Sequence, residues 1–476
     1  MTAFLLQLLI SIFFIHGSFS QSCATIGCQG GLQCDFNTGI CRQFRSAFTG
    51  PFLVQCAICF DWDLLEERSK IENIPLDCAP VVNGSEYPKP ILRAKLWTHH
   101  FDWYEDQIFK AKNICAVMHK YFVFEREPLS EEEQDFPLAY GIVVYKDIVQ
   151  LLLELSIFYH PQNTYCFTVD QAATDQYRDA IMRIADCFPN LHAFAGAKSD
   201  WGSFGILENV YTCFSHLTNT DHPWKYYQYL AGFDFPMRTN LEMVRIFKKL
   251  NGSFNTDFDE FDNDRYKNME GVMPPLPLYK SSMSVAVPRE AANFMISNKR
   301  VKKMLRYLRT TFIPDESFWS SIAGAPSLLP LPGSIRARDV LWFRKSFFSV
   351  HPSELNTINS IGTSFIGRYQ VWVWQKPCNG KITNWSCVFG VGDIEVIAKR
   401  PELVAHKFYL TLEPAASLCL VKEIRRRSRE NTDFDARSYA EMPTVELNAG
   451  KSITQLKHPD WLVRSSFYNP AYEHFT

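Results

Sequence analysis

Residues 139–170 read AYGIVVYKDIVQLLLELSIFYHPQNTYCFTVD, and this stretch decides the expected fold class. Residues 139–144 are a short apolar run rich in β-branched side chains, which predicts a buried strand. Apolar residues recur at helical spacing over 147–159, and 165–169 form a second apolar run that ends at Asp170. A strand, a helix and a strand in this order predict a parallel βαβ unit.

The same alternation continues downstream to residue 250. Further strands are expected at 191–194 and 226–231, and further helices at 174–187, 204–217 and 240–250, the last of them capped by Asn240. This order predicts an α/β fold with a mostly parallel sheet and helices on both of its faces. Because ligands bind at the carboxyl ends of parallel strands, Asp170 and Asp234 are candidate site residues. No glycine-rich phosphate loop follows any of these strands, so neither a dinucleotide site nor a P-loop is expected.

The first residues of the chain have the layout of a secretory signal. Residues 4–15 are apolar apart from Gln7 and Ser11, and small residues precede a possible cleavage point after Ser20. A cleaved signal peptide and an uncleaved signal anchor, both at 1–20, stay open as interpretations, with a buried helix as the structural alternative. The fourteen cysteines fit an oxidising compartment, in which they can pair. The sequence therefore predicts a protein of the secretory pathway.

The cysteines nearest the N-terminus crowd into one short stretch. Six of them lie between Cys23 and Cys59, and glycines and polar residues separate the first four without apolar periodicity. This pattern predicts a small disulfide-rich module at 21–60 that precedes the α/β domain. Cys56 and Cys59 also form a C-x-x-C pair, which is compatible with a redox or zinc half-site, but no second such pair supports that alternative.

The composition narrows the possible functions. A net charge of −2 gives no indication of a nucleic-acid-binding protein. The 38 Phe, 20 Tyr and 11 Trp residues fit either a large aromatic core or stacking on sugar rings, and composition alone does not choose between them.

Five motifs occur in one order along the second part of the chain. They read EPLSEEE at 127–133, PQNTYCFTVD at 161–170, YLAGFDFPMRTNLE at 229–242, PDESFW at 314–319, and CVFGVGD at 387–393 with AHKF at 405–408. Together they resemble the core-2/I-branching β-1,6-N-acetylglucosaminyltransferases, glycosyltransferase family 14. The resemblance covers about residues 112–425.

The resemblance implies a fold, a reaction and a location. We expect a GT-A-like domain that transfers a sugar, usually N-acetylglucosamine (GlcNAc), with inversion from a UDP-sugar to the 6-hydroxyl of an O-glycan or related acceptor. No metal ion or other cofactor is expected, and the expected partners are the UDP-sugar and a glycan or glycoprotein. The expected location is the Golgi membrane, as a type II protein with a lumenal catalytic domain, and the alternative is secretion. The expected organisation is a signal peptide or signal anchor at 1–20, a Cys-rich module at 21–60, a stem and N-terminal extension at 61–137, a GT-A-like glycosyltransferase domain at 138–425 and a C-terminal tail at 426–476.

The resemblance also assigns roles to single residues. Glu316 matches the catalytic base, which takes the proton of the acceptor hydroxyl. The structural alternative is that this acid merely begins a helix. The residues that match the family's donor-binding positions are Val143, Tyr145, Asp170, Trp201 and Lys407. Weaker matches to acceptor-binding positions are Asp257 and Tyr369.

One position departs from the family pattern. Asn384 stands where the family has a second phosphate-binding arginine, and Arg368 and Lys381 are the candidate substitutes. Asn384 is also one of three N-glycosylation sequons, together with Asn83 and Asn251. The departure keeps two other functions open: a weakly active or inactive family member that binds glycan or nucleotide, and a secreted interaction protein that works through its Cys-rich module.

The remaining expectations concern cysteines and metal ligands. The resemblance implies the disulfides Cys115–Cys187, Cys166–Cys213, Cys378–Cys387 and Cys78–Cys419. Asp257-Phe258-Asp259 has the form of a metal-binding D-x-D motif, but it lies in an acidic loop after a helix, so we expect a solvated loop and no metal site.

Overall fold

The structure is a computed structural model, and it describes residues 32–35, 40–43, 70–266, 272–350, 363–375, 377–430 and 433–463. The chain divides into two compact units, Met1–Leu65 and Glu66–Thr476. In the first unit β1 (Leu32–Asp35) pairs antiparallel with β2 (Ile40–Gln43), with Cys34 opposite Cys41. The predicted signal at 1–20 and the rest of the predicted Cys-rich module lie outside the described residues.

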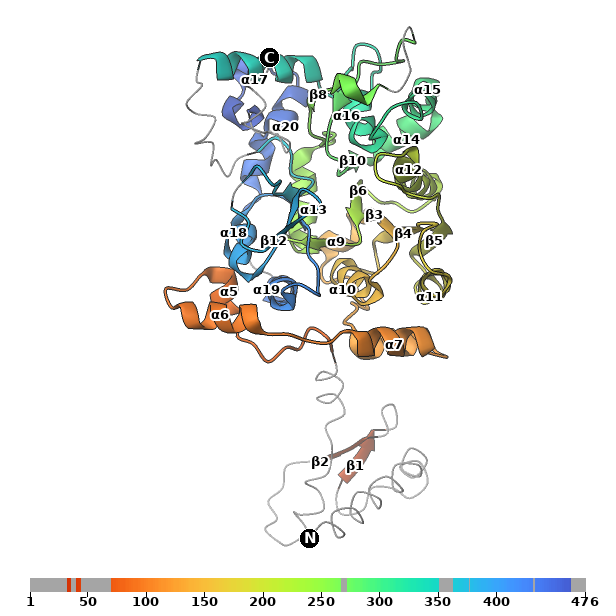
Figure 1. Ribbon diagram of the computed structural model, residues 1–476, viewed down its shortest axis with the longest axis vertical. Coiled ribbons are helices and arrows are strands. Elements are labelled where there is room, and N and C mark those ends of the chain that lie inside the picture. Colours follow the sequence, from red (N-terminus) through yellow and green to blue (C-terminus); the bar gives the residue numbers. More distant parts are fainter. Residues whose placement is uncertain are drawn as a thin grey trace. The chain divides into compact units, whose positions relative to one another are not determined.

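The second unit is built around a five-stranded sheet (Figure 1). Its strands are β3 (Leu138–Val144), β4 (Thr164–Val169), β5 (Leu191–Ala195), β6 (Tyr226–Ala231) and β10 (Ala286–Pro288). The strand order is β10-β6-β3-β4-β5, and only the edge strand β10 runs antiparallel to its neighbour. The predicted α/β class with a mostly parallel sheet is therefore confirmed.

Side chains alternate between two cores, one on each face of the sheet. Tyr140 and Ile142 of β3 belong to the first core, whereas Tyr227 and Tyr229 of β6 belong to the second. Among the helices that contribute to the first core are α10 (Ile148–Phe158), α11 (Asp175–Ala185) and α13 (Asn240–Leu250), and among those that contribute to the second are α12 (Phe204–Asn219), α14 (Arg289–Ser297), α15 (Lys299–Leu308) and α16 (Phe318–Ala323). The prediction of helices on both faces is thus confirmed.

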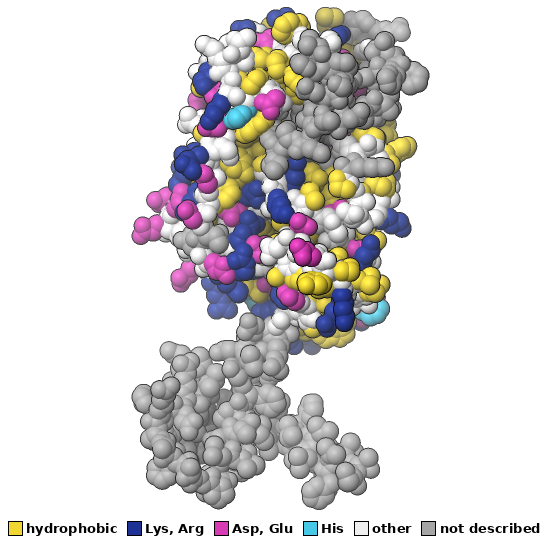
Figure 2. Space-filling model, turned by 90° about the vertical axis from the view of Figure 1, so that its left-hand side faces the viewer, with side chains coloured by type: hydrophobic (Ala, Val, Ile, Leu, Met, Phe, Trp, Pro, Cys, Tyr) yellow, Lys and Arg dark blue, Asp and Glu magenta, His cyan; other side chains and the backbone are white. Residues whose placement is uncertain are grey.

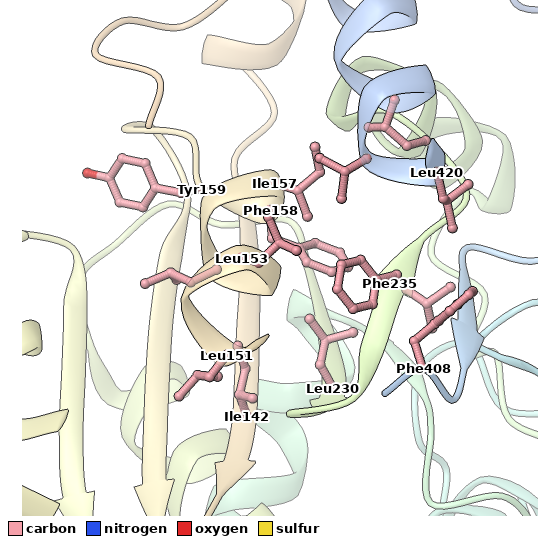
Figure 3. Packing of buried hydrophobic residues seen from close by; sticks show 14 of the residues in the cluster. Ile142, Leu151, Leu153, Ile157, Phe158, Tyr159, Leu230, Phe235, Phe408 and Leu420 are labelled. Carbon is pink, nitrogen blue, oxygen red and sulfur yellow. The ribbon is translucent and has the colours of Figure 1, made fainter. Parts of the chain in front are cut away.

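Helix α10 occupies the middle of the first core. All eleven of its residues are buried. Leu151 lies beside Ile142 of the sheet, and Phe158 lies toward Phe235, which packs on Phe408 (Figure 3). Apolar side chains occur all around this helix, interrupted by Gln150, Glu154 and Ser156, because it lies between the sheet and the C-terminal elements.

A second, smaller sheet joins segments that are far apart in the sequence. Its strands are β7 (Asp234–Pro236), β11 (Tyr369–Gln370) and β14 (Val404–His406), in the order β11-β14-β7. Beside it lies a hairpin of β12 (Lys381–Thr383) and β13 (Ser386–Val388). Because β14 pairs with β7, residues 404–408 lie next to the strand end at 231–236. A third pairing joins β8 (Asp259–Glu260) to β9 (Tyr279–Lys280).

The segment that precedes the sheet packs on the same core. It contains α5 (Ala79–Asn83), α6 (Pro88–Leu96), α7 (Asp102–Lys110), α8 (Ile114–Tyr121) and α9 (Glu131–Gln134). Ile108 and Met118 are fully buried in the first core. The segment that was expected to serve as a stem and extension is thus, from residue 70, part of the folded unit.

The C-terminal segment is also folded. Helix α19 (Pro414–Glu430) runs through the expected boundary at residue 425, and α20 (Pro443–Asn448) follows it. Arg425 is buried and pairs with Glu72 at 3.3 Å and with Glu125 at 3.4 Å. Within the run of arginines, the partners of Arg425 lie 300 or more positions away in the sequence, whereas Arg426 pairs with Glu423 and Glu430 of its own helix. The other helices are α17 (Ala337–Val350) and α18 (Ile394–Lys399).

All four disulfides that the resemblance implies are present: Cys78–Cys419, Cys115–Cys187, Cys166–Cys213 and Cys378–Cys387. One helix cap differs from expectation, because Thr239 rather than Asn240 is the N-cap of α13. Among the described helices, none combines the length and the apolar character that crossing a membrane requires.

Candidate active site

Glu316 ends a short 3₁₀ turn, Pro314–Glu316, whose leading proline suits the first helical position. Its Oε2 accepts a hydrogen bond of 2.8 Å from Nη2 of Arg265, and its side chain is 21% exposed. The backbone N–H of Ser281 donates to the carbonyl of Glu316 at 2.6 Å. Within the described residues Oε1 accepts no hydrogen bond. One carboxylate oxygen is therefore fixed, while the other stays open to a ligand.

Arg265 was not singled out by the sequence. Its side chain is only 6% exposed, and its Nε pairs with Asp262 Oδ2 at 3.0 Å. Lys280 Nζ approaches the same oxygen of Asp262 at 3.1 Å. Arg265 is thus a positioning residue that fixes the carboxylate of Glu316. A lone arginine in an acidic loop carries no motif that could have indicated this role.

Asp315 is the buried neighbour of Glu316. Burial and the nearby charge of Glu316 raise the pKa of Asp315 from its ordinary value of 3.8 to about 7. Its Oδ1 has no hydrogen-bond partner among the described residues. Two adjacent carboxyl groups therefore face different surroundings, and Asp315 holds its proton far more readily than an exposed aspartate.

Trp201 lies on the loop after β5, beside the segment that carries Glu316. Its side chain is 75% exposed, and its ring meets the ring of Phe312 edge-to-face at 5.1 Å. The N–H of Ile313 donates to the carbonyl of Gly202 at 3.1 Å. Gly202 has a φ of +75°, and a Cβ there would lie 2.1 Å from the Phe312 ring, so only glycine fits. These contacts bring the loop of Trp201 to the predicted base.

Asp170 follows β4, where it ties two loops together. Its Oδ1 accepts from the N–H of Ala172 at 2.6 Å, and its Oδ2 accepts from the N–H of Ser199 at 2.9 Å. Its own N–H donates to the carbonyl of Val144 at 2.9 Å. The carboxylate is therefore held rigidly at the carboxyl end of the sheet, where it is 4% exposed.

Two other predicted donor-binding residues lie at the end of the neighbouring strand. Val143 is half-buried in β3 and pairs in register with Thr168 of β4. Tyr145 follows β3, is 42% exposed, and its ring lies 6.1 Å from the ring of Phe233. The structure thus brings Val143, Tyr145 and Asp170 to one edge of the sheet.

Lys407 follows β14 and is almost buried, at 6% exposure. Its Nζ donates to the carbonyl of Thr383 at 3.0 Å and lies 5.6 Å from the centre of the Tyr409 ring. Burial lowers the pKa of Lys407, and the positive charge of Lys146 lowers it further. Lys146, which the sequence did not single out, therefore lies close enough to repel Lys407.

The carbonyl that accepts from Lys407 belongs to the hairpin that contains Asn384. Asn384 and Trp385 are the two turn residues between β12 and β13, with φ values of 50° and 63°. Positive φ at both positions is what a two-residue I′ turn requires. Asn384, Asn83 and Asn251 are all exposed, so each sequon is open to solvent.

The two candidate substitutes for the missing arginine lie in different surroundings. Arg368 is buried, and its Nη2 pairs with Oδ2 of Asp234 at 2.6 Å. Lys381 is exposed on β12. Arg368 is therefore committed to a carboxylate inside the protein.

Asp234, the other strand-end acid, connects three segments under the site. Its Oδ2 also accepts from the N–H of Ala231 at 2.7 Å, and its Oδ1 lies 2.7 Å from Nδ1 of His406. Burial lowers the pKa of His406 to about 4, and the charge of Arg368 acts in the same direction, whereas Asp234 acts in the opposite one. The neutral imidazole thus donates from Nδ1 to the carboxylate, which fixes the strand that leads into Lys407.

The two weaker acceptor-binding predictions fall on buried side chains. Asp257 is 1% exposed and lies 3.4 Å from Nη2 of Arg344, so the expectation that the D-x-D segment is a solvated loop is wrong for this residue. The negative charge of Asp257 can be buried because the positive charge of Arg344, from α17, compensates it. Tyr369 is buried in β11, where it stacks on Phe389 at 5.7 Å.

The chain matches known proteins over most of its length. The family model described as Core-2/I-Branching enzyme matches residues 138–397. A human β-1,3-galactosyl-O-glycosyl-glycoprotein β-1,6-N-acetylglucosaminyltransferase is 29% identical over 77% of this chain and 89% of its own length. A mouse N-acetyllactosaminide β-1,6-N-acetylglucosaminyl-transferase is 28% identical over 70% of this chain and 84% of its own.

A solved structure, that of the mannosyltransferase Ktr4p from S. cerevisiae, is similar at 14% identity and a TM-score of 0.17, over 53% of this chain and 67% of that one. The family model covers more than half of the chain and includes four of the five motifs in full or in large part. The chain therefore belongs to the Core-2/I-branching enzyme family.

Proposed function

We propose that this protein is an inverting glycosyltransferase that moves GlcNAc from UDP-GlcNAc to the 6-hydroxyl of an O-glycan or related acceptor, without a metal ion. The observation that carries the proposal is the carboxylate of Glu316, fixed by Arg265 at one oxygen and open at the other, in a member of this family. The curated relatives are named as β-1,6-N-acetylglucosaminyltransferases.

The proposed step is a single displacement. The open oxygen of Glu316 takes the proton of the acceptor hydroxyl while the hydroxyl oxygen attacks the anomeric carbon of the donor sugar. The bond between that carbon and the diphosphate oxygen breaks, and UDP leaves on the opposite side of the sugar. Attack and departure on opposite sides invert the anomeric configuration. Arg265 keeps the carboxylate in one orientation, which a base in a single displacement requires.

The donor end of the site follows from the strand-end residues. A carboxylate has about four acceptor positions, and backbone N–H groups occupy one on each oxygen of Asp170. Asp170 can therefore still accept from the ring N–H of uracil. Trp201, exposed beside the Glu316 segment, offers an aromatic face to a sugar ring.

The leaving UDP needs positive charge near its diphosphate. Lys407 supplies a fixed ammonium group after β14, held by Thr383. Its positive charge offsets the charge that develops on the leaving group, which is the contribution a metal ion makes in other enzymes. We propose that this lysine makes a metal ion unnecessary for the reaction.

We also propose that the protein works in the secretory pathway. Four disulfides in the second unit require an oxidising compartment. The name of the human relative describes a transferase that acts on an O-glycosyl-glycoprotein. Retention in the Golgi membrane by the N-terminal segment is the arrangement we favour, and secretion is the alternative.

The test is a transfer assay on the purified lumenal protein. UDP-GlcNAc and UDP-Glc are offered with core-1 O-glycan acceptors in the presence of EDTA, and the product linkage is read by NMR. We expect β-1,6-linked GlcNAc, and Glu316→Gln should lower kcat by a factor of about 10³ because the amide of glutamine cannot take the proton.

Glu290→Gln is the matched control, because Glu290 is an exposed acid in the first turn of α14. It should transfer at the wild-type rate. Absence of transfer from either donor by the wild-type protein would exclude the proposed reaction for these substrates. Transfer that persists in Glu316→Gln would remove Glu316 as the base, and loss of transfer with EDTA would exclude a metal-free reaction.

A further inference from the structure

Lys146 and Lys407 lie beside the same aromatic ring at the carboxyl end of the central sheet. Their Nζ atoms are 5.8 Å and 5.6 Å from the centre of the Tyr409 ring. We propose that Lys146 is a second diphosphate-binding residue that acts together with Lys407 on the donor. This inference rests on the proposed function, because it takes a UDP-sugar as the ligand.

Three aromatic rings hold the ammonium group of Lys146. Its Nζ lies 5.3 Å from the ring centre of Tyr145 and 5.6 Å from that of Phe233, in addition to the ring of Tyr409. Aromatic faces attract a cation without neutralising it, because their negative charge is a quadrupole and not a net charge. The rings therefore orient Lys146 and leave its full positive charge for a ligand.

The carboxylate nearest to Lys146 does little to cancel that charge. Asp147 Oδ2 lies 3.6 Å from Nζ, and the two side chains are 42% and 47% exposed. Exposed ion pairs of this kind contribute little and exchange readily with solvent. Among the described residues no other carboxylate forms an ion pair with Lys146, and none forms one with Lys407. The ammonium groups of Lys146 and Lys407 thus lie in one region, and the exposed carboxylate of Asp147 offsets little of their charge.

The location suits an anionic ligand. Lys146 comes two residues after the end of β3, next to the strand end where ligands of parallel sheets bind. Helix α10 begins at Ile148, so its positive N-terminal end points to the same place. Lys146 remains half-exposed and can reach a ligand, whereas Lys407 is fixed from inside.

The two ammonium groups repel each other. Burial lowers the pKa of Lys407, and the positive charge of Lys146 lowers it further. A diphosphate between the two ammonium groups would replace this repulsion with two charge-assisted contacts. Lys146 therefore supplies the second cation that Asn384 does not, from a different strand and not from the hairpin.

The experiment compares the binding of UDP with that of uridine, by calorimetry on the whole lumenal protein. Lys146→Gln should weaken UDP binding about tenfold and leave uridine binding within about twofold, because only UDP carries the diphosphate. Lys407→Gln should have the same selective effect. Lys146→Arg keeps the charge and should bind UDP within about threefold of wild type. Lys110→Gln, an exposed lysine on α7, is the control and should change neither ligand.

Each outcome has a distinct meaning. If the wild type binds UDP and Lys146→Gln binds it equally well, Lys146 has no role and the proposed donor survives. If Lys146→Gln weakens UDP and uridine alike, the residue shapes the pocket and the diphosphate assignment is wrong. If the wild type does not bind UDP at all, the proposed donor itself is wrong, and this inference is lost with it.

Discussion

Asp315 and Glu316 are neighbours in the sequence, yet their side chains meet different environments. Glu316 reaches a buried arginine and remains partly exposed, whereas Asp315 is enclosed and one of its oxygens has no hydrogen-bond partner among the described residues. A carboxyl group that is enclosed without a full set of partners favours its neutral form. This difference makes the stability of the protein dependent on pH through Asp315.

We predict that Asp315→Asn changes this dependence. The pKa of Asp315 is about 7 in the folded protein and 3.8 ordinarily, so the folded state binds more protons between these values. Its contribution to stability is therefore complete below about pH 4 and is lost as pH rises through 7, by about 1.4 kcal/mol for each unit of pKa shift. Asn does not titrate, so the variant should gain on the wild type as pH rises from 4 to 8.

Urea unfolding at several pH values measures the effect. The free energy of unfolding of the variant minus that of the wild type should increase steadily across this window and level off above pH 8. Parallel profiles for the two proteins would mean that Asp315 does not titrate in the window.

Single residues of the site differ in how far the sequence reveals them. Glu316, Asp170 and Lys407 lie in motifs that resemble the family, so the sequence alone identifies them as candidates. Arg265 and Lys146 stand in no motif, and their roles depend on contacts with residues 51 and more than 200 positions away. Such contacts arise only when the chain is folded, so local sequence could not indicate them.

At the scale of elements, the N-caps of helices α13 and α12 can be compared, because one makes capping hydrogen bonds and the other does not. The side chain of Thr239 accepts from the N–H of Glu242 at 3.1 Å, and Glu242 accepts from the N–H of Thr239 at 3.0 Å. This reciprocal pair is a capping box at the start of α13. Ser203 occupies the equivalent position of α12, but its hydroxyl makes no capping hydrogen bond.

We predict that Thr239→Ala lowers the free energy of unfolding by about 1–2 kcal/mol, because a buried N–H loses its acceptor. Ser203→Ala should change it by less than about 0.5 kcal/mol, since no capping bond is lost. Chemical denaturation of both variants is the measurement. Equal losses would show that the hydrogen-bond geometry of the caps does not decide their stability.

The strands and helices of the central sheet were predicted well, whereas strands of only two or three residues were not. The strand at 226–231 and the helix at 240–250 have the expected bounds, and the predicted strand at 165–169 differs from β4 by one residue. The small sheet of β7, β11 and β14 escaped prediction, because strands of two or three residues show no alternation. Helix α19 was not predicted either; within it Arg425 is buried and pairs with the distant Glu72, a contact that local sequence does not indicate.

At the scale of the whole molecule, disulfides connect distant parts of the chain. Cys78–Cys419 joins residues 341 positions apart, while Cys378–Cys387 closes a loop of nine. Cross-linking distant residues removes more freedom from the unfolded chain than closing a short loop. Cys78–Cys419 also holds the N-terminal helices against α19, so it stabilises the packing of both ends of the unit.

We predict that Cys78→Ala with Cys419→Ala costs about 3–5 kcal/mol, and that Cys378→Ala with Cys387→Ala costs about 2 kcal/mol less than this. Thermal and urea unfolding of the two double variants, with the other disulfides intact, gives the comparison. An equal cost for both pairs would mean that loop length does not set their contribution. On the face shown in Figure 2, acidic and basic side chains of the described residues are intermixed.

The bond between Cys78 and Cys419 also sets an order of events during synthesis. A ribosome that adds about 5–20 residues per second needs roughly 20–70 s to make the 341 residues between the two cysteines. In the secretory location that we propose, Cys78 enters the oxidising lumen during that time, before its native partner has been made. The six cysteines from Cys23 to Cys59 are synthesised just before it and are available for pairing. We therefore predict that a disulfide isomerase speeds maturation, because thiol exchange would release any Cys78 that has paired before the C-terminal helix has emerged.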